Sequence, residues 1–303
     1  MSQKRIVLAG GSGFLGQALA RELRQRDYQV TILTRTPRER QDGITERAWD
    51  GVHPGPWTSA LEGAEAVVNL AGRNINCPHT AANLAELTAS RVNSVNALAT
   101  ALPSLKQPPK TWVQASAVGF YGDTADRICV ETTPGGTGHL ADICRDWEQA
   151  LHAIPLPRPR TVILRIGFVL GREGGALPVL SKITKLFLGG AVGNGRQYIS
   201  WIHVRDVTRI FRLAIEEDWS GVYNAVGPAP VTNAEFMKQL RSAWHRPWSP
   251  PAPAFAVRLG SRLLQSEASL ALMSCRALPQ RLEERGFGFE YNQLATALRD
   301  LCG

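Results

Sequence analysis

The chain has 303 residues, of which 44% are hydrophobic and 20% are charged, and this balance excludes a mainly disordered protein. No stretch approaches the roughly 18 consecutive apolar residues that a membrane helix needs, so we expect no membrane partner. The net charge of +8 raises nucleic acid as a partner. The basic residues are scattered, however, and no zinc-finger, helix-turn-helix or RNA-binding pattern occurs, so we expect no nucleic-acid partner either.

The cysteines and the amino terminus indicate the compartment. Five cysteines are scattered along the chain, namely Cys77, Cys129, Cys144, Cys275 and Cys302. None forms a CxxC pair or joins a cluster with metal-ligand spacing, which predicts reduced thiols and no metal site. The first five residues lead directly into a strand pattern, without the apolar run of a secretory signal. We therefore expect a cytoplasmic protein.

In the amino-terminal half, short apolar runs rich in β-branched residues alternate with longer amphipathic stretches. This alternation is typical of βαβ units, in which helices cover both faces of a parallel sheet, and it predicts an α/β fold. The expected strands are Arg5–Ala9, Gln29–Thr34, Ala66–Ala71, Thr111–Ser116 and Thr161–Ile166. The expected helices between them are Phe14–Arg26, Ala81–Leu102 and Leu140–Ala153.

The sequence changes in character near Gly171, where glycine-rich loops begin. Two helices are expected after it, at Val204–Glu216 and Asn233–Trp244, and the proline-rich stretch His245–Phe255 is typical of a linker. The last fifty or so residues are mostly helical in pattern and end with a helix near Asn292–Leu301. We expect a sheet domain over residues 1–170, which later segments can join, and a lobe over residues 171–303 that includes a small helical domain at 250–303.

Three glycines in "GGSGFLG" follow the first expected strand and precede the first helix. The unpaired N–H groups of a helix start attract anions, and glycine lets a phosphate approach the backbone closely. The strand, turn and helix together predict a pyrophosphate-binding turn. Its expected contacts are Gly10, Gly13, Phe14, Leu15 and Gly16. The alternative is a turn with a structural role only.

The second expected strand ends in Thr34 and Arg35. An acidic residue commonly stands there in proteins that bind NAD, because it pairs with the ribose 2′-hydroxyl. A guanidinium instead suits a 2′-phosphate, so this position favours NADP(H) as cofactor. Arg38 or Arg40 can share that role, and the alternative is that Arg35 is a solvated surface charge.

Several motifs resemble the extended branch of the short-chain dehydrogenase/reductase superfamily. "GGSGFLG" matches its cofactor turn, and "VVNLAG" (Val67–Gly72) resembles its fourth strand, which runs past the adenosine ribose. "SRVNSVNAL", "SAVGFYGD", "CRDWE", "LRIGFVLG" and "ALPQRLEERGFGF" look like an atypical subgroup labelled epimerase family proteins. The last of these motifs falls in a small C-terminal domain of unknown role that marks the subgroup.

The resemblance implies a Rossmann-type doubly wound parallel sheet that binds NADP(H), with a smaller, mostly helical C-terminal substrate lobe. It implies an epimerase-like or oxidoreductase-like reaction at a hydroxyl or carbonyl carbon of a small molecule, such as a nucleotide-sugar, and it leaves a homodimer open. Further cofactor contacts implied by it are Leu70, Ala71, Gly72, Glu86, Arg91 and Val169. For Glu86 and Arg91, the alternative is a solvated pair on a helix surface.

The chain departs from this superfamily at the proton relay, where active members use a tyrosine and a lysine four residues later. None of the five tyrosines has that lysine. Aligning "LADICRDWE" by Glu148 places Leu140 and Cys144 at the two relay positions. The remaining candidates for catalysis are Ser116, at the end of a strand, and Tyr121. Tyr121 is a hypothetical acid/base, and the alternative is an ordered loop tyrosine that packs beside the ligands.

Two later motifs carry polar residues with weaker indications. In "WIHVRDV" we expect Asp206 to cap the following helix and His203 to be structural. The loop "LGGAVGNGRQ" is expected to line the substrate cleft, where Arg196 could meet an anionic substrate. Because the relay is missing, a second interpretation stays open, in which the chain is an NADP(H) sensor or a structural dinucleotide-binding protein without turnover.

Overall fold

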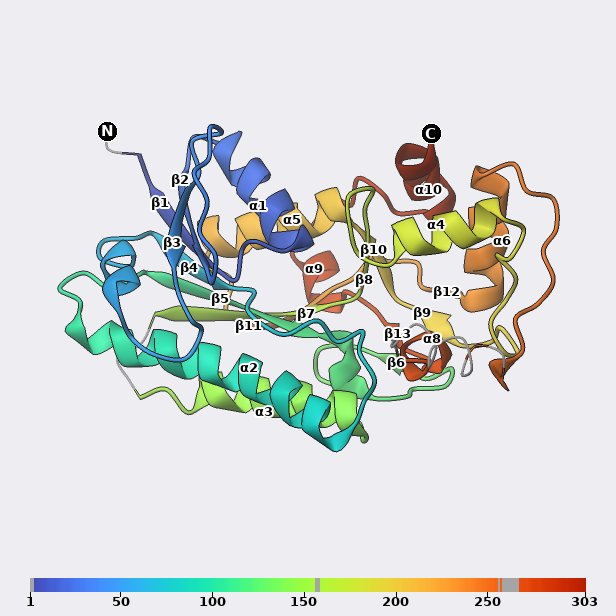
Figure 1. Ribbon diagram of the computed structural model, residues 1–303, viewed down its shortest axis with the longest axis horizontal. Helices are drawn as coiled ribbons and strands as arrows, with labels where there is room; N and C mark the ends of the chain where they lie inside the picture. The colour runs from blue at the N-terminus through green and yellow to red at the C-terminus, as the bar shows by residue number, and fades with distance from the viewer. Residues whose placement is uncertain (1–2, 156–158, 256, 258–266) are drawn as a thin grey trace.

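The computed structural model describes residues 3–155, 159–255, 257 and 267–303, and its largest element is a seven-stranded parallel sheet (Figure 1). The strand order is β11-β7-β5-β4-β1-β2-β3. The strands are β1 (Arg5–Ala9), β2 (Gln29–Thr34), β3 (Thr45–Ala48), β4 (Ala66–Asn69), β5 (Thr111–Ala117), β7 (Arg160–Ile166) and β11 (Gly221–Ala225). The chain order reverses between β1 and β4, and open parallel sheets bind ligands at such a reversal.

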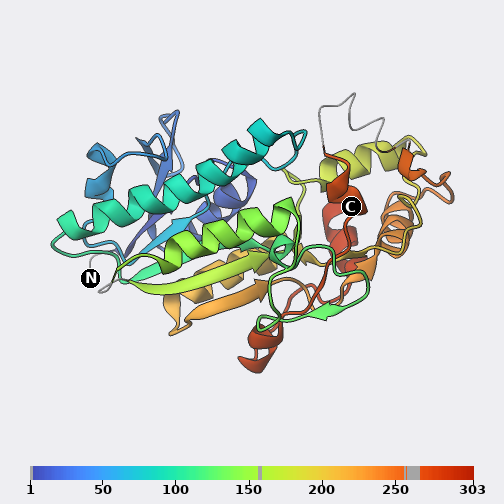
Figure 2. The same ribbon diagram turned by 90° about the horizontal axis from the view of Figure 1, so that it is seen from below.

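Helices cover both faces of this sheet, as the sequence predicts. On one face α1 (Phe14–Arg24) packs against α5 (Val204–Glu216). On the other face α2 (Ala81–Ala101) packs against α3 (His139–His152), and Figure 2 shows this pair side by side across the sheet. The prediction of a Rossmann-type doubly wound sheet is confirmed.

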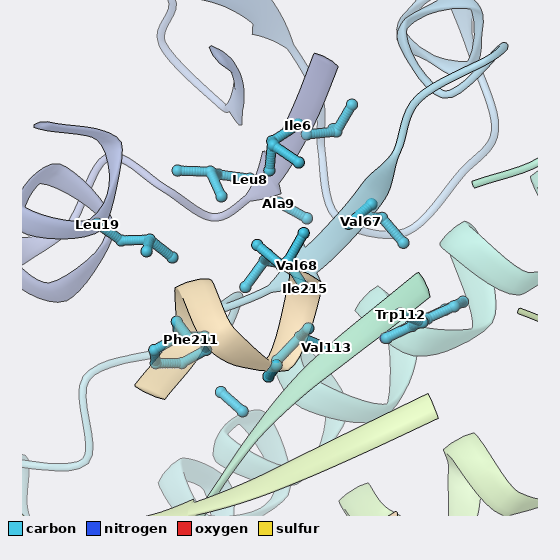
Figure 3. Packing of buried hydrophobic residues seen from close by; sticks show 14 of the residues in the cluster. Ile6, Leu8, Ala9, Leu19, Val67, Val68, Trp112, Val113, Phe211 and Ile215 are labelled. Atoms are coloured by element: carbon cyan, nitrogen blue, oxygen red, sulfur yellow. The ribbon is translucent and has the colours of Figure 1, made fainter. Parts of the chain in front are cut away.

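Burial in the core explains why the sequence pattern predicts these strands and helices. In β1, Ile6 and Leu8 are fully buried, and so are Leu19 of α1 and Phe211 of α5 (Figure 3). A strand of a parallel sheet has both faces covered, so its residues form a continuous apolar run instead of an alternating one. Full burial of each such side chain contributes roughly 1.5–3 kcal/mol.

The second half of the chain builds a lobe at the carboxyl ends of the strands, with a core of its own (Figure 1). Its helices are α4 (Leu177–Lys185), α6 (Asn233–Ala243) and α10 (Leu294–Cys302), with the short helices α8 (Ser269–Leu272) and α9 (Gln280–Glu284). Its short strands are β8 (Phe168–Leu170), β9 (Tyr198–Ile199), β10 (Trp201–His203) and β12 (Val231–Thr232). Within the part of the chain that the structure describes, no helix has the length and apolar character needed to cross a membrane.

The lobe is not a separate block in sequence. Helix α5 and strand β11 follow residue 170 but belong to the sheet domain, which the predicted division allowed. Further on, β13 (Arg276–Ala277) pairs with β6 (Ile128–Cys129), and Arg281 of α9 donates a hydrogen bond to the carbonyl of Val222 in β11. The segment expected to be a linker also has backbone partners, because Ala252 N–H donates to Ala191.

The expected role of Asp206 was wrong in its detail. The N-cap of α5 is His203, whose Nδ1 accepts the N–H of Arg205 at 3.1 Å. Asp206 lies within the first turn, fully buried, and its carboxylate accepts the N–H groups of Glu290 and Tyr291. Asp206 therefore anchors the C-terminal segment to α5 and does not cap the helix.

Candidate functional site

The glycine turn after β1 has the geometry of an anion cradle. A Cβ on Gly10, whose φ is +73°, would lie 2.6 Å from the Cα of Ala71, and one on Gly16 would lie 2.5 Å from the Cα of Gly11. These two glycines allow β1, the segment after β4 and α1 to pack closely. Gly13 differs, because a Cβ there would meet no atom within 4 Å. The space above Gly13 is open.

Helix α1 begins at this open space without a protein group to cap it. Gly13 is its N-cap, no side chain caps the helix, and its first turn holds no acidic residue. The N–H groups of Phe14, Leu15 and Gly16 are therefore free of helical partners and directed toward the turn. The ring of Phe14 packs against Gly171 and Gly174 in the loop after β8. The turn fits the pyrophosphate of a dinucleotide.

The basic residues after β2 divide into two kinds. Arg40 is used by the fold, since its guanidinium pairs with Asp42 and Glu46 and donates to Gln17 of α1. Arg35 is exposed, and among the described residues no side chain pairs with its guanidinium. Arg38 is also exposed, and its backbone N–H donates to the Glu46 carboxylate. Arg35 thus remains free for a phosphate beside the turn.

The segment after β4 lies against the glycine turn, as the cofactor prediction requires. Leu70 N–H donates to Ala9 at the end of β1, and Ala71 contacts Gly10. Gly72 lies over Arg91 of α2, whose guanidinium donates to the carbonyls of Leu87 and Arg73.

Two other predicted cofactor contacts have different surroundings. Glu86 forms an exposed ion pair with Arg73, which resembles the solvated alternative. Val169 is half-buried in β8, where it pairs with Ile202.

A row of buried polar side chains crosses the carboxyl ends of three adjacent strands. Ser116 of β5 lies in register with Arg165 of β7, which lies in register with Asn224 of β11. The Ser116 hydroxyl donates to Glu148 of α3 at 2.6 Å. Arg165 forms a two-pronged ion pair with the same carboxylate, at 2.8 and 3.0 Å. The proton of Ser116 is thus held by a buried carboxylate.

Tyr121 belongs to this buried network and not to an open site. It is fully buried, and its hydroxyl lies 2.7 Å from Asn224 Oδ1 and 3.0 Å from the Val130 carbonyl, while it accepts from Arg165 at 3.1 Å. Burial raises the pKa of its hydroxyl to about 12. The acid/base role remains a hypothesis, and these contacts favour the alternative of a packed tyrosine.

The first of the two aligned relay positions, Leu140, lies at the wall of a cavity of about 880 Å³, called here the Leu140 cavity. Leu140 lines it, together with Asp123 after β5, Thr80 before α2, and Glu267 before α8. Cys144, one turn further along α3, is buried, and burial raises the pKa of its thiol to about 11. Neither relay position carries a group that exchanges protons near neutral pH.

Two expectations about the substrate side do not fit the cavity. The loop "LGGAVGNGRQ" is absent from the described lining, and Gly190 packs instead on Pro250. Arg196 is exposed and is also absent from that lining. The reason is that the loop is held between the proline-rich segment and α6, as the N–H bond from Ala234 to Gly195 shows.

Sequence reasoning missed three members of the buried network. Glu148 served only to align a motif, and Arg165 and Asn224 were not singled out. The available signal was an arginine within "VILRI", because a charge in a fully buried strand requires a partner.

Comparison with known proteins agrees with this architecture. Residues 6–143 match the NAD dependent epimerase/dehydratase family, and residues 252–301 match a domain of unknown function, DUF1731. Epimerase family protein ML0860 of Mycobacterium leprae is 38% identical over 301 residues, which cover 98% of this chain and 95% of that protein.

Two solved structures are similar over the whole chain. The crystal structure of human epimerase family protein SDR39U1 (isoform2) with NADPH has a TM-score of 0.87 and 32% identity, covering 98% of this chain and 99% of that one. A nucleoside-diphosphate sugar epimerase from Corynebacterium glutamicum has a TM-score of 0.81 and 31% identity, covering 100% of this chain and 59% of that one. The chain therefore belongs to the NAD dependent epimerase/dehydratase family, in the subgroup of epimerase family proteins that carry the DUF1731 domain.

Proposed function

We propose that this protein binds NADP(H) and acts as an oxidoreductase or epimerase on a hydroxyl or carbonyl carbon of a small molecule in the Leu140 cavity. One observation carries the cofactor assignment: the uncapped start of α1 faces open space above Gly13, beside the free guanidinium of Arg35. The human relative, whose crystal structure contains NADPH, supports it. The unpaired cysteines favour a reducing compartment such as the cytoplasm.

Each part of the cofactor site has a distinct role in this proposal. The N–H groups at the start of α1 hold the pyrophosphate, and Arg35 binds the 2′-phosphate with charge-assisted hydrogen bonds. The backbone of residues 70–72 lies along the adenosine ribose. When bound, NADP(H) supplies hydride transfer.

Proton transfer needs a group that reaches the cavity. The ionisable side chains on its described wall are Asp123, Glu267, His79 and His139, and His139 directly precedes Leu140 at the start of α3. Ser116 acts as a positioning residue in this proposal, because its proton is directed to Glu148.

A second function is favoured by one specific observation, the apolar Leu140 and the buried thiol of Cys144 at the relay positions. In that alternative the protein senses NADP(H) without turnover. A screen of alcohols, aldehydes and ketones separates the two when it follows nicotinamide absorbance for net oxidation or reduction and product stereochemistry by NMR for epimerisation, in which the cofactor is regenerated. Oxidation of NADPH or reduction of NADP⁺ by any of them establishes the enzyme.

The binding site is tested by Gly13→Val, with nicotinamide fluorescence as the readout. The φ of −79° at Gly13 suits any residue, so the fold is expected to tolerate valine while its side chain fills the phosphate space. We expect NADPH affinity to fall by about 100-fold, or about 2.7 kcal/mol. Gly288→Ala, at another glycine with open surroundings, is the control and leaves affinity unchanged. Equal affinity of Gly13→Val and wild type would contradict the site.

A further inference from the structure

The Leu140 cavity has a charge that is unusual for this chain. Asp123 and Glu267 lie on its wall, and among the described residues that line it none is lysine or arginine. The chain as a whole carries a net charge of +8. A separate cavity of about 610 Å³, beside α4, is lined by Arg172, Lys182 and Lys185. Cations therefore line another cavity and are missing from the described wall of this one.

Both carboxylates are fixed by backbone N–H groups. Asp123 accepts the N–H of Ala125 at 3.0 Å. Glu267 accepts the N–H of Ser269 at 3.0 Å and of His79 at 3.1 Å. Burial alone would raise the pKa of Glu267, but these N–H groups outweigh it and the pKa lies below its ordinary value. The two charges are thus held in place at the cavity.

The amino-terminal ends of α2 and α3 also face the cavity, and their partial positive charge opposes the negative charge of the two carboxylates. A helix end carries about half a positive charge, so two ends supply about one charge against two carboxylates. The end of α2 is capped by the Thr80 hydroxyl, and α3 has Asp142 in its first turn. On the described wall, with His79 and His139 counted as neutral, the two carboxylates therefore exceed the charge of the helix ends.

We infer that the Leu140 cavity takes a neutral or cationic hydroxyl or carbonyl compound, and that it rejects nucleoside diphosphate sugars and other phosphorylated substrates. The inference rests on the proposed function, because it names the substrate class of the same site. A diphosphate would bring two or more negative charges next to Asp123 and Glu267, and no described residue of the wall is the arginine or lysine that usually pairs with phosphate.

The local field can be measured without knowing the substrate. Thr137 is exposed and lines the cavity, so Thr137→Cys in a Cys77→Ser background gives a reporter thiol there. Two methanethiosulfonate reagents are compared at pH 8, a cationic one that carries a trimethylammonium group and an anionic one that carries a sulfonate. The rate at which each reagent modifies the reporter thiol is divided by the rate at which the same reagent reacts with 2-mercaptoethanol. We expect the cationic reagent to be favoured about fivefold, against the net charge of the whole chain.

Variants of the two carboxylates make the measurement specific. We expect Asp123→Asn and Glu267→Gln, each added to the reporter chain, to lower the ratio of the cationic to the anionic rate toward 1. An anionic reagent that reacts as fast as the cationic one, or faster, overturns the inference. This experiment needs no cofactor, whereas the proposed function fails if NADPH does not bind, so the two failures are distinguishable.

A ligand experiment tests the excluded substrate class directly. UDP-glucose is titrated into the full chain by calorimetry, with and without saturating NADPH. We expect no binding up to about 1 mM. A Kd below that concentration overturns the exclusion of nucleoside diphosphate sugars.

Discussion

Two regions lie at the carboxyl ends of the strands of one sheet, namely the glycine turn after β1 and the polar row across β5, β7 and β11. They differ in their access to a ligand. The turn is open, uncapped and bordered by a free arginine. The polar row is closed, because Ser116, Glu148, Arg165, Tyr121 and Asn224 satisfy one another within the core. One end of a parallel sheet can therefore hold an open anion cradle and, beside it, a closed network of buried polar side chains.

The largest expected effect comes from breaking the closed region. Arg165→Ala leaves Glu148 as a buried charge without its partner, so we expect the free energy of unfolding to fall by about 3–5 kcal/mol. Urea denaturation of the full chain measures it. Lys238→Ala, which removes an exposed ion pair with Glu235 on α6, is the control and should change stability by less than about 0.5 kcal/mol. A similar small loss for Arg165→Ala would show that the polar row is not structural.

The second effect concerns the buried thiol at the relay position. Because burial raises the pKa of Cys144 to about 11, the unfolded chain loses this proton first as pH rises. The thiol leaves stability unchanged below about pH 9 and lowers it as pH rises from about 9 to 11, by up to about 2 kcal/mol. Cys144→Ala should flatten the alkaline fall in unfolding free energy, and Cys77→Ala should not. Identical pH profiles for wild type and Cys144→Ala would contradict the burial.

We expect Tyr121→Phe to have the smallest effect on stability. This variant also decides whether Tyr121 has a structural role or transfers a proton. Removing a hydroxyl bonded to Asn224 should cost about 1 kcal/mol of unfolding free energy. If Tyr121 is structural, turnover with any substrate found in the screen stays near the wild-type value. A fall of 100-fold or more at unchanged NADPH affinity would instead assign the proton to Tyr121 and reopen the closed region.

Much of the fold follows from local sequence patterns. The strands β1 and β2 and helix α5 have the predicted bounds, and most other predicted elements differ by one or two residues at an end. Strand β3 was not expected, because Thr45–Ala48 is a largely exposed edge without an apolar run. Helix α4 and strand β11 were not expected either. Short elements such as these depend on packing with distant segments more than on their own pattern.

The candidate site also has parts that local sequence predicts and parts that depend on distant segments. The glycine turn is encoded within one strand, one turn and one helix, so this local pattern predicts it. In the polar row, hydrogen-bonded partners lie 17 to 103 positions apart in the chain, and the register between β5, β7 and β11 helps to bring them together. The cavity wall at Glu267 depends on a return of the chain from the C-terminal segment, which no local pattern specifies.

The most direct test of the account is a titration with NADPH and NADH, on the wild-type chain and on Arg35→Ala, followed by nicotinamide fluorescence. Arg38 and Arg40 follow the same strand and can share the phosphate, so the control is Arg299→Ala, at an exposed arginine of α10. We expect NADPH to bind at least about tenfold more tightly than NADH, a difference of about 1.4 kcal/mol, and Arg35→Ala to remove this preference. Failure of the wild-type chain to bind either nucleotide would contradict the dinucleotide site and, with it, the proposed function.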